Sequence, residues 1–105
     1  MASGKLGSAA LSATTNTTIY TVPAGNISTF NINVLNTGTS ATTVRVAVSS
    51  NATPTMSDYI EFDYSLAANG VLERTAVIAT AGEVVVGYAG AANITIRVHG
   101  VEETV

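Results

Sequence analysis

Apolar residues recur at every second position in several segments of this 105-residue chain, and no other feature constrains its fold as strongly. Phe30, Ile32 and Val34 alternate with polar residues, and segments 44–48 and 94–98 repeat the pattern. A strand that buries one face has this period of two, whereas an amphipathic helix repeats every 3.6 residues. Val, Ile, Thr and Tyr dominate the segments, and such side chains favour the pleated backbone of a strand. The chain is therefore expected to be all-β.

Turn-forming residues at 23–26, 36–40, 49–57, 67–70, 81–82 and 89–92 separate short segments, and no helical pattern interrupts the series. The tally is about eight strands. The strands are expected near Ala9, Tyr20, Ile32, Val46, Phe62, Thr75, Val85 and Ile96. Such a series predicts a single antiparallel β-sandwich, of either the jelly-roll or the immunoglobulin-like type. The sandwich domain is expected to span 14–105, after a flexible or partner-docking N-terminal arm at 1–13.

The inward side of each alternation gives a predicted core. Its members are Phe30, Ile32, Val34, Val46, Phe62, Val86, Ile96 and Val98. On the same logic, Glu61 and Asp63 share the opposite face of the strand that contains Phe62. Glu73 and Arg74 are neighbours on another strand, so their side chains are expected to point to opposite faces.

Charged residues make up only 10% of the chain, against about 25% in a typical domain, and the net charge is −3. So few basic residues cannot cover a phosphate backbone, so nucleic-acid binding is not expected. The longest apolar run is far shorter than the roughly 20 residues of a membrane-spanning helix, and no signal peptide is recognised. A surface this poor in charge favours self-association. The composition therefore predicts a subunit of an assembly that also binds its own copies as a homo-oligomer.

No reactive constellation stands out, so neither an enzyme nor a cofactor is expected. The chain has no cysteine, and His99 is its one histidine. Catalysis and metal binding by histidine both need partners, which His99 lacks in the sequence pattern, so no metal site is expected. Asp58, Glu61 and Asp63 form the densest acidic group, and the sequence leaves open whether they bind a cation or are solvated.

The N-terminal arm, the charged pair at 73–74 and the polar face of the last strand supply the candidates for an interface with partners. The predicted interface residues are Lys5, Leu6, Leu11, Glu73, Arg74, Arg97 and His99. For Glu73 and Arg74, an inter-subunit ion pair and a protected edge strand are both open.

Two stretches resemble known proteins. Residues 17–25, with the sequence YTVPAG at their end, are similar to the start of small β-modules in virion proteins of tailed bacteriophages. Residues 58–63 (DYIEFD) and 66–75 (LAANGVLERT) look like small structural proteins of phages that infect marine bacteria and cyanobacteria. The similarity extends over most of the chain from about residue 14.

The resemblance implies a virion structural protein without catalytic residues, assembled in the cytoplasm of the bacterial host. Capsid decoration (cement) is the leading expectation, with the major capsid protein or other virion proteins as partners. A neck, tail or fibre module that binds a receptor or a glycan is the alternative. The position in the virion and the copy number stay open at this point.

Overall fold

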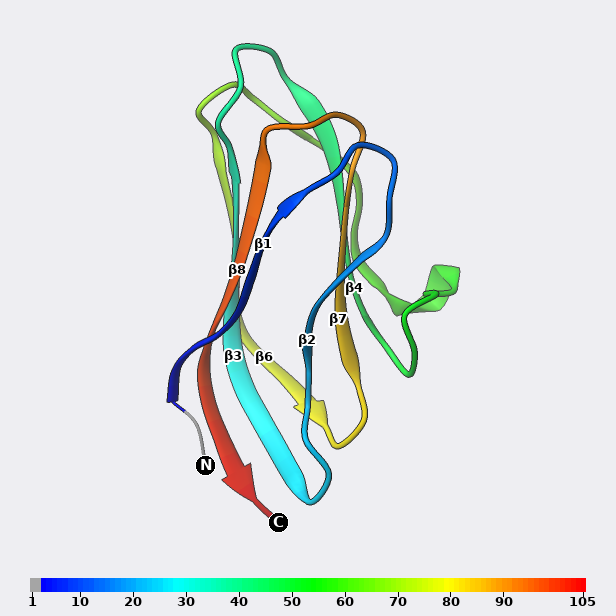
Figure 1. The fold of residues 1–105 in the computed structure, drawn as a ribbon, viewed down its shortest axis with the longest axis vertical. Helices are drawn as coiled ribbons and strands as arrows, with labels where there is room; N and C mark the ends of the chain where they lie inside the picture. Colours follow the sequence, from blue (N-terminus) through cyan, green and yellow to red (C-terminus); the bar gives the residue numbers. More distant parts are fainter. Residues whose placement is uncertain (1–2) are drawn as a thin grey trace.

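The computed structural model describes residues 3–105 and consists of eight antiparallel strands in two packed four-stranded sheets (Figure 1). The strands are β1 (Ser3–Leu11), β2 (Thr17–Thr21), β3 (Asn26–Asn36), β4 (Thr42–Ser49), β5 (Tyr59–Leu66), β6 (Val71–Thr80), β7 (Val84–Ala89) and β8 (Ile94–Thr104), with one short 3-10 turn, η1 (Met56–Asp58), before β5. Each strand lies where the alternation places one, so the all-β sandwich is confirmed.

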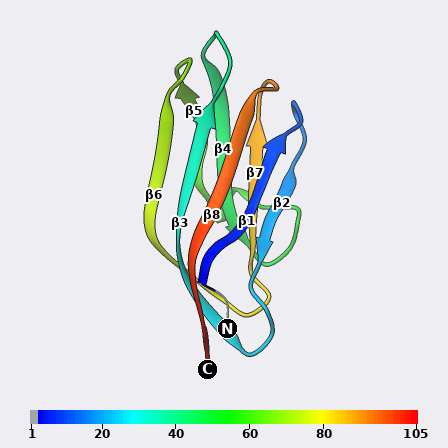
Figure 2. The same ribbon diagram turned by 60° about the vertical axis from the view of Figure 1, so that its left-hand side comes forward.

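The two sheets have the strand order of a jelly roll. The first sheet runs β1-β8-β3-β6 and the second β2-β7-β4-β5, and all neighbours are antiparallel. The chain changes sheet at every connection except the one from β4 to β5, which gives the paired Greek keys of this architecture. Figure 2 shows the first sheet in front, with β6, β3, β8 and β1 side by side. The strand order therefore decides between the two sandwich types that the sequence leaves open.

The core lies between the sheets and is built around β3 and β8. These strands pair without interruption from Asn26↔Thr104 to Asn36↔Ile94, so the alternation of each is preserved along its whole length. This core contains, as predicted, the buried residues Phe30, Ile32, Val34, Val46, Ile96 and Val98. The prediction is wrong for Phe62, which is exposed, and for the face of Val86, which is buried outside the core in a separate cluster with Ala47 and Val84. Burial of such apolar side chains is the main stabilising contribution in a domain of this size.

The predicted register of β5 is wrong, because β-bulges interrupt its pairing with β4 at two points. Asp63 lies in one of them with a positive φ of 52°. A bulge adds one residue to a strand and so reverses the face of every residue beyond it. Glu61 therefore points toward the first sheet, whereas Phe62, 43% exposed, and Asp63 lie on the outside of the second sheet. The prediction that Glu61 and Asp63 share a face is wrong for the same reason.

The prediction of an N-terminal arm separate from the sandwich also needs correction. Residues 3–11 form β1, which pairs with β8 from Ser3↔Val101 to Leu11↔Ile94. Met1 and Ala2, the first residues of the predicted arm, lie outside the described residues. The strand hydrogen bonds order the segment, so the small residues of β1 belong to the domain itself.

The two lateral sides of the sandwich are closed in different ways. Beside β1, Gly7 lies so close to the carbonyl oxygen of Ile19 in β2 that any larger residue would clash. On the opposite side, Arg74 of β6 forms an ion pair with Glu61 of β5. Arg74 aligns with the core residue Ile32, while its neighbour Glu73 lies on the outside, so their predicted opposite orientation is confirmed.

Candidate functional site

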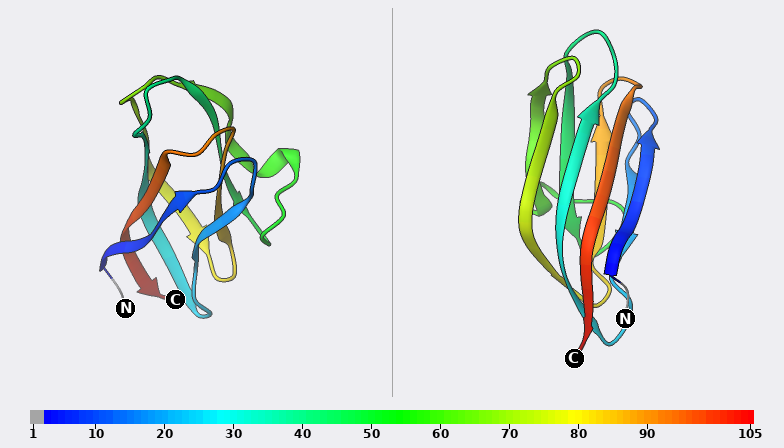
Figure 3. Two further views of the ribbon diagram at one scale, coloured as in Figure 1. Left: turned by 45° about the horizontal axis from the view of Figure 1, so that its top comes forward. Right: turned by 90° about the vertical axis from the view of Figure 1, so that its left-hand side faces the viewer.

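Each sheet presents an outer face, and most of the predicted interface residues meet on one of them. We call the outside of the first sheet the first outer face. It carries alternate residues at 27–35 and 95–103, whereas bulges shift the period in β1 and β6, so that Lys5 and Ser8, and Glu73 and Ile78, share this face. Lys5 aligns with His99, while Arg97 and Glu73 both align with Asn33, which lies between them on β3. In the right-hand view of Figure 3 this sheet faces the reader. The fold thus gathers Lys5, Glu73, Arg97 and His99 from three strands.

The other predicted interface residues are used inside the chain. Leu11 is buried in the core, and Leu6 packs against the same cluster. A side chain enclosed by its own core cannot contact a partner, which corrects the expectation for Leu11. Arg74 is paired with Glu61 within the chain and lies on the edge strand β6, which agrees with the edge-strand interpretation for Arg74. An inter-subunit ion pair of Glu73 stays a prediction.

The first outer face holds every charged side chain that lacks a partner among residues 3–105. These side chains, without a hydrogen bond or ion pair, are Lys5, Glu73, Arg97 and Glu103. The basic ones lie on β1 and β8, and Glu73 lies on β6 at the far edge of the sheet. Charged side chains elsewhere in the described chain are paired or hydrogen-bonded. The first outer face is therefore the part of residues 3–105 on which charged side chains are available to a partner.

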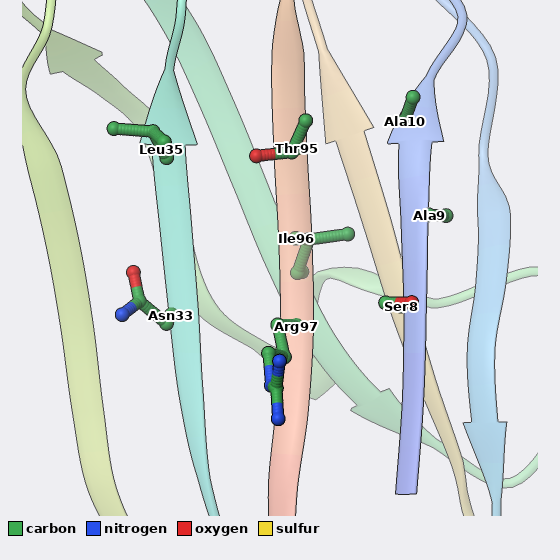
Figure 4. Close-up of a pocket in the computed structure, with 8 residues that line it drawn as sticks. All are labelled: Ser8, Ala9, Ala10, Asn33, Leu35, Thr95, Ile96 and Arg97. Carbon is green, nitrogen blue, oxygen red and sulfur yellow. The ribbon is translucent and has the colours of Figure 1, made fainter. Parts of the chain in front are cut away.

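A groove of about 420 Å³ runs over β8 on the first outer face (Figure 4). Ser8 and Ala10 of β1 are small, whereas Leu35 of β3 and Arg97 of β8 are large, and this difference in side-chain size hollows the surface. Figure 4 shows Arg97 over β8, with Ser8 on the strand at one side and Asn33 on the strand at the other. The groove is within the volume range of binding pockets, about 300–1,000 Å³.

His99 adds an unsatisfied polar atom to this face. Its Nδ1 atom is buried and has no hydrogen-bond partner among the described residues. Buried polar atoms are hydrogen-bonded in the great majority of cases, and Nδ1 of His99 is an exception on this face.

On the second outer face, the outside of the second sheet, the charged side chains are by contrast paired with residues of the same face. Arg45 donates a hydrogen bond from Nε to Oδ1 of Asp63 at 2.6 Å. Its guanidinium lies over the rings of Phe62 and Tyr88, 4.2 and 4.5 Å from their centroids. Tyr59 packs edge-on against Phe62, with ring centroids 5.0 Å apart. The arrangement is a stabilising cation–π cluster in which Arg45 covers one face of each ring.

The sequence pattern does not reveal this aromatic cluster. The alternation predicts Phe62 in the core and places Arg45 on the polar side of segment 44–48. Arg45 and Tyr88 are direct cross-strand neighbours, which pairing of β4 with β7 would have suggested. The two bulges on either side of Glu61, which together leave Phe62 and Asp63 on the outside, have no signal in the sequence.

The acidic group at 58–63 is dispersed by the fold. Asp58 accepts hydrogen bonds from the Thr55 backbone N–H at 2.8 Å and from the Ser49 hydroxyl at 3.1 Å, and so caps η1. The Thr55 N–H lowers the pKa of Asp58 below its usual value, because it stabilises the carboxylate. Glu61 and Asp63 face different arginines. Among residues 3–105, no three His, Asp or Glu side chains gather closely enough to hold a metal ion.

A buried polar network at the base of the sandwich was also missed. Tyr20 donates a hydrogen bond to Oε2 of Glu102 at 2.5 Å, and its hydroxyl lies 2.6 Å from Oγ of Ser28. All of these residues are buried. Burial, together with the Glu102 carboxylate, raises the pKa of Tyr20 to about 12. The network ties β2 to β3 and β8 in the interior and offers no access for a ligand.

Within the part of the chain that the structure describes, no helix is long and apolar enough to span a bilayer. No family model, no curated protein and no solved structure matches the chain. The resemblance to phage virion proteins therefore stays a prediction that rests on residues 17–25 and 58–75.

Proposed function

We propose that this chain is a structural subunit of a tailed-phage virion, with capsid decoration as the leading role. It would bind the major capsid protein, or other virion proteins, and its own copies through the first outer face. The observation that carries the proposal is that the unpartnered charges Lys5, Glu73, Arg97 and Glu103 all lie on this one face. A domain that pairs its other charges internally leaves this face chemically suited to a protein surface.

The fold and the composition support the same role. Jelly rolls recur in viral capsid proteins as well as in lectins, although a fold alone does not fix a function. Only 10% of the residues are charged, which favours a protein whose surface is partly covered by partners. Decoration repeats weak contacts by symmetry, so avidity replaces the need for one tight site.

A census of purified virions by mass spectrometry tests the proposal. We expect the protein in the particle at a copy number that matches the capsid lattice. A low copy number, matching the neck or the fibres, would reassign its position in the virion. Absence of the protein from purified particles would overturn the proposal.

A glycan-binding fibre module is the second candidate, and the groove over β8 is what favours it. Ser8, Asn33 and Thr95 supply hydroxyl and amide groups in a cavity of about 420 Å³. Sugar sites also use exposed aromatic faces, and the faces of Phe62 and Tyr88 are occupied by Arg45 on the opposite side of the molecule. Glycan-array binding that is lost in Asn33→Ala, with melting unchanged, would favour this candidate over decoration.

A further inference from the structure

We infer that two copies of this chain pack first outer face against first outer face, around a twofold axis that runs along β3. In this arrangement Arg97 of each copy lies opposite Glu73 of the other. The inference rests on the proposed function, because it names the contact through which a virion subunit would bind its own copies.

The register of the sheet supplies the charge complementarity. Arg97 on β8 and Glu73 on β6 both align with Asn33 on β3, so they lie at one level on either side of that strand. A twofold axis along β3 keeps each level in place and exchanges the two sides, which brings β8 over β6 of the second copy. Arg97 and Glu73, unpaired within one chain, then form two equivalent pairs.

The apolar residues of the face follow the same symmetry. Val101 on β8 and Ile78 on β6 both align with Thr29 on β3, and they are 41% and 62% exposed. The same axis places Val101 of one copy against Ile78 of the other. Val71, 51% exposed, aligns with Leu35 and so meets the end of the groove over β8 of the second copy. Apolar groups thus face apolar groups, and a protruding side chain faces a hollow.

The size of the contact sets its strength. Three overlapping strands about 4.8 Å apart, each about 30 Å long, cover roughly 450 Å² per copy and roughly 900 Å² for the pair. Stable complexes bury about 1,200–2,000 Å², so this dimer is of the weak class. It forms at high protein concentration, or where many copies are held side by side on a particle.

Charge reversal tests the pairing directly. Arg97→Glu and Glu73→Arg each place like charges at both symmetric contacts, and we expect each to raise the dimer Kd at least about tenfold. The double variant Arg97→Glu/Glu73→Arg restores opposite charges and should return the Kd to near the wild-type value. Thr43→Glu is the control, because it adds a negative charge at an exposed position of β4, in the other sheet and away from the overlapping strands. Sedimentation equilibrium up to millimolar concentration measures each Kd, and thermal melting checks that each variant is folded.

Several outcomes overturn the inference. They are a wild-type protein that stays monomeric at every concentration, single reversals that leave the Kd unchanged, and a double variant that does not recover. The virion census separates these failures from failure of the proposed function. A protein that is present in virions but monomeric in solution overturns the dimer alone, whereas a dimer with this charge pattern that is missing from virions overturns the proposed function alone.

Discussion

The two outer faces of the sandwich use their charged residues in opposite ways. On the second outer face, Arg45 is held by Asp63 and by the rings of Phe62 and Tyr88. On the first outer face, Arg97 and Glu73 have no side-chain partner, although both stand on the surface of the same small domain. The difference shows that charge on the second face contributes to the fold, whereas charge on the first face is available to a partner.

The second outer face also has a small apolar cluster of its own. Ala47, Val84 and Val86 are buried there beneath Tyr59, apart from the main core. This side of the molecule therefore covers part of its apolar surface with its own side chains, although Phe62 is still 43% exposed. The first outer face has no such cover and keeps exposed Val71, Ile78 and Val101 beside its unpaired charges.

The largest expected effect separates the core from the second outer face. Phe30, 1% exposed, is enclosed by the core, so Phe30→Ala should lower the free energy of unfolding by about 3–5 kcal/mol. Phe62→Ala loses only an edge-on ring contact and a cation–π contact, and should cost about 1–2 kcal/mol. Urea denaturation of both variants measures the difference. Equal losses would mean that the second outer face is continuous with the core.

The next largest effect concerns the buried hydroxyl of Tyr20, which is hydrogen-bonded to Glu102 in the interior. The pKa of Tyr20, about 12 in the folded chain and about 10 when unfolded, favours the neutral phenol in the folded state. The stability due to this preference is complete below pH 10 and is lost as the pH rises through 12, by up to about 3 kcal/mol. Unfolding measured between pH 9 and pH 12, on the wild type and on Tyr20→Phe, checks this window.

The test compares how steeply the free energy of unfolding falls with pH in the two proteins, and not its absolute value at any one pH. Tyr20→Phe also removes a hydrogen bond from Glu102, so it should be less stable than the wild type at neutral pH as well. We expect the variant to lose less stability than the wild type as the pH rises. Parallel profiles would contradict the role of the Tyr20–Glu102 contact.

The sequence predicts the strands of this molecule better than it predicts the faces of the strands. In β3 and β8 the ladder is uninterrupted, so the period of two alone places Phe30, Ile32 and Ile96 inside. In β5 a residue with positive φ at Asp63 breaks the period, and nothing in the residue types marks that position as a bulge. Alternation thus identifies the core face in β3 and β8. It fails in β5, where the pairing has bulges, and in β7, where Val84, Val85 and Val86 are all buried, so that both faces are apolar.

Only part of the first outer face could be predicted from the sequence. Arg97 and His99 are two residues apart on one strand, so their shared face followed from the alternation. That Lys5 and Glu73 lie on the same face depends on the order β1-β8-β3-β6, which the pattern of one chain does not contain. The absence of internal partners for Arg97 and Glu73 likewise depends on tertiary structure, because Arg45 and Arg74 are indistinguishable from Arg97 by residue type.

A direct comparison of two arginines sharpens the contrast between the faces. Arg45→Ala removes two cation–π contacts and an ion pair at a partly exposed site, and should destabilise the isolated domain by about 1–2 kcal/mol. Arg97→Ala should change stability by less than about 0.5 kcal/mol, because no described contact within the chain depends on its charge. Thermal unfolding at low protein concentration measures both. A larger loss for Arg97→Ala would show that the first outer face stabilises the monomer after all.

The smallest expected effect is the coupling between paired charges at the lateral edge. The Glu61 side chain is only 10% exposed beside Arg74, whose own side chain is 46% exposed, so solvent screens their attraction in part. A double-mutant cycle with Glu61→Gln and Arg74→Gln should give a coupling of about 0.5–1 kcal/mol. The matched cycle with Glu73→Gln and Arg97→Gln should give a coupling near zero in dilute solution, because the two residues lie two strand spacings, about 10 Å, apart within one chain. If the second cycle showed as much coupling as the first, Arg97 and Glu73 would already be partners within the monomer, and the distinction between the two outer faces would fail.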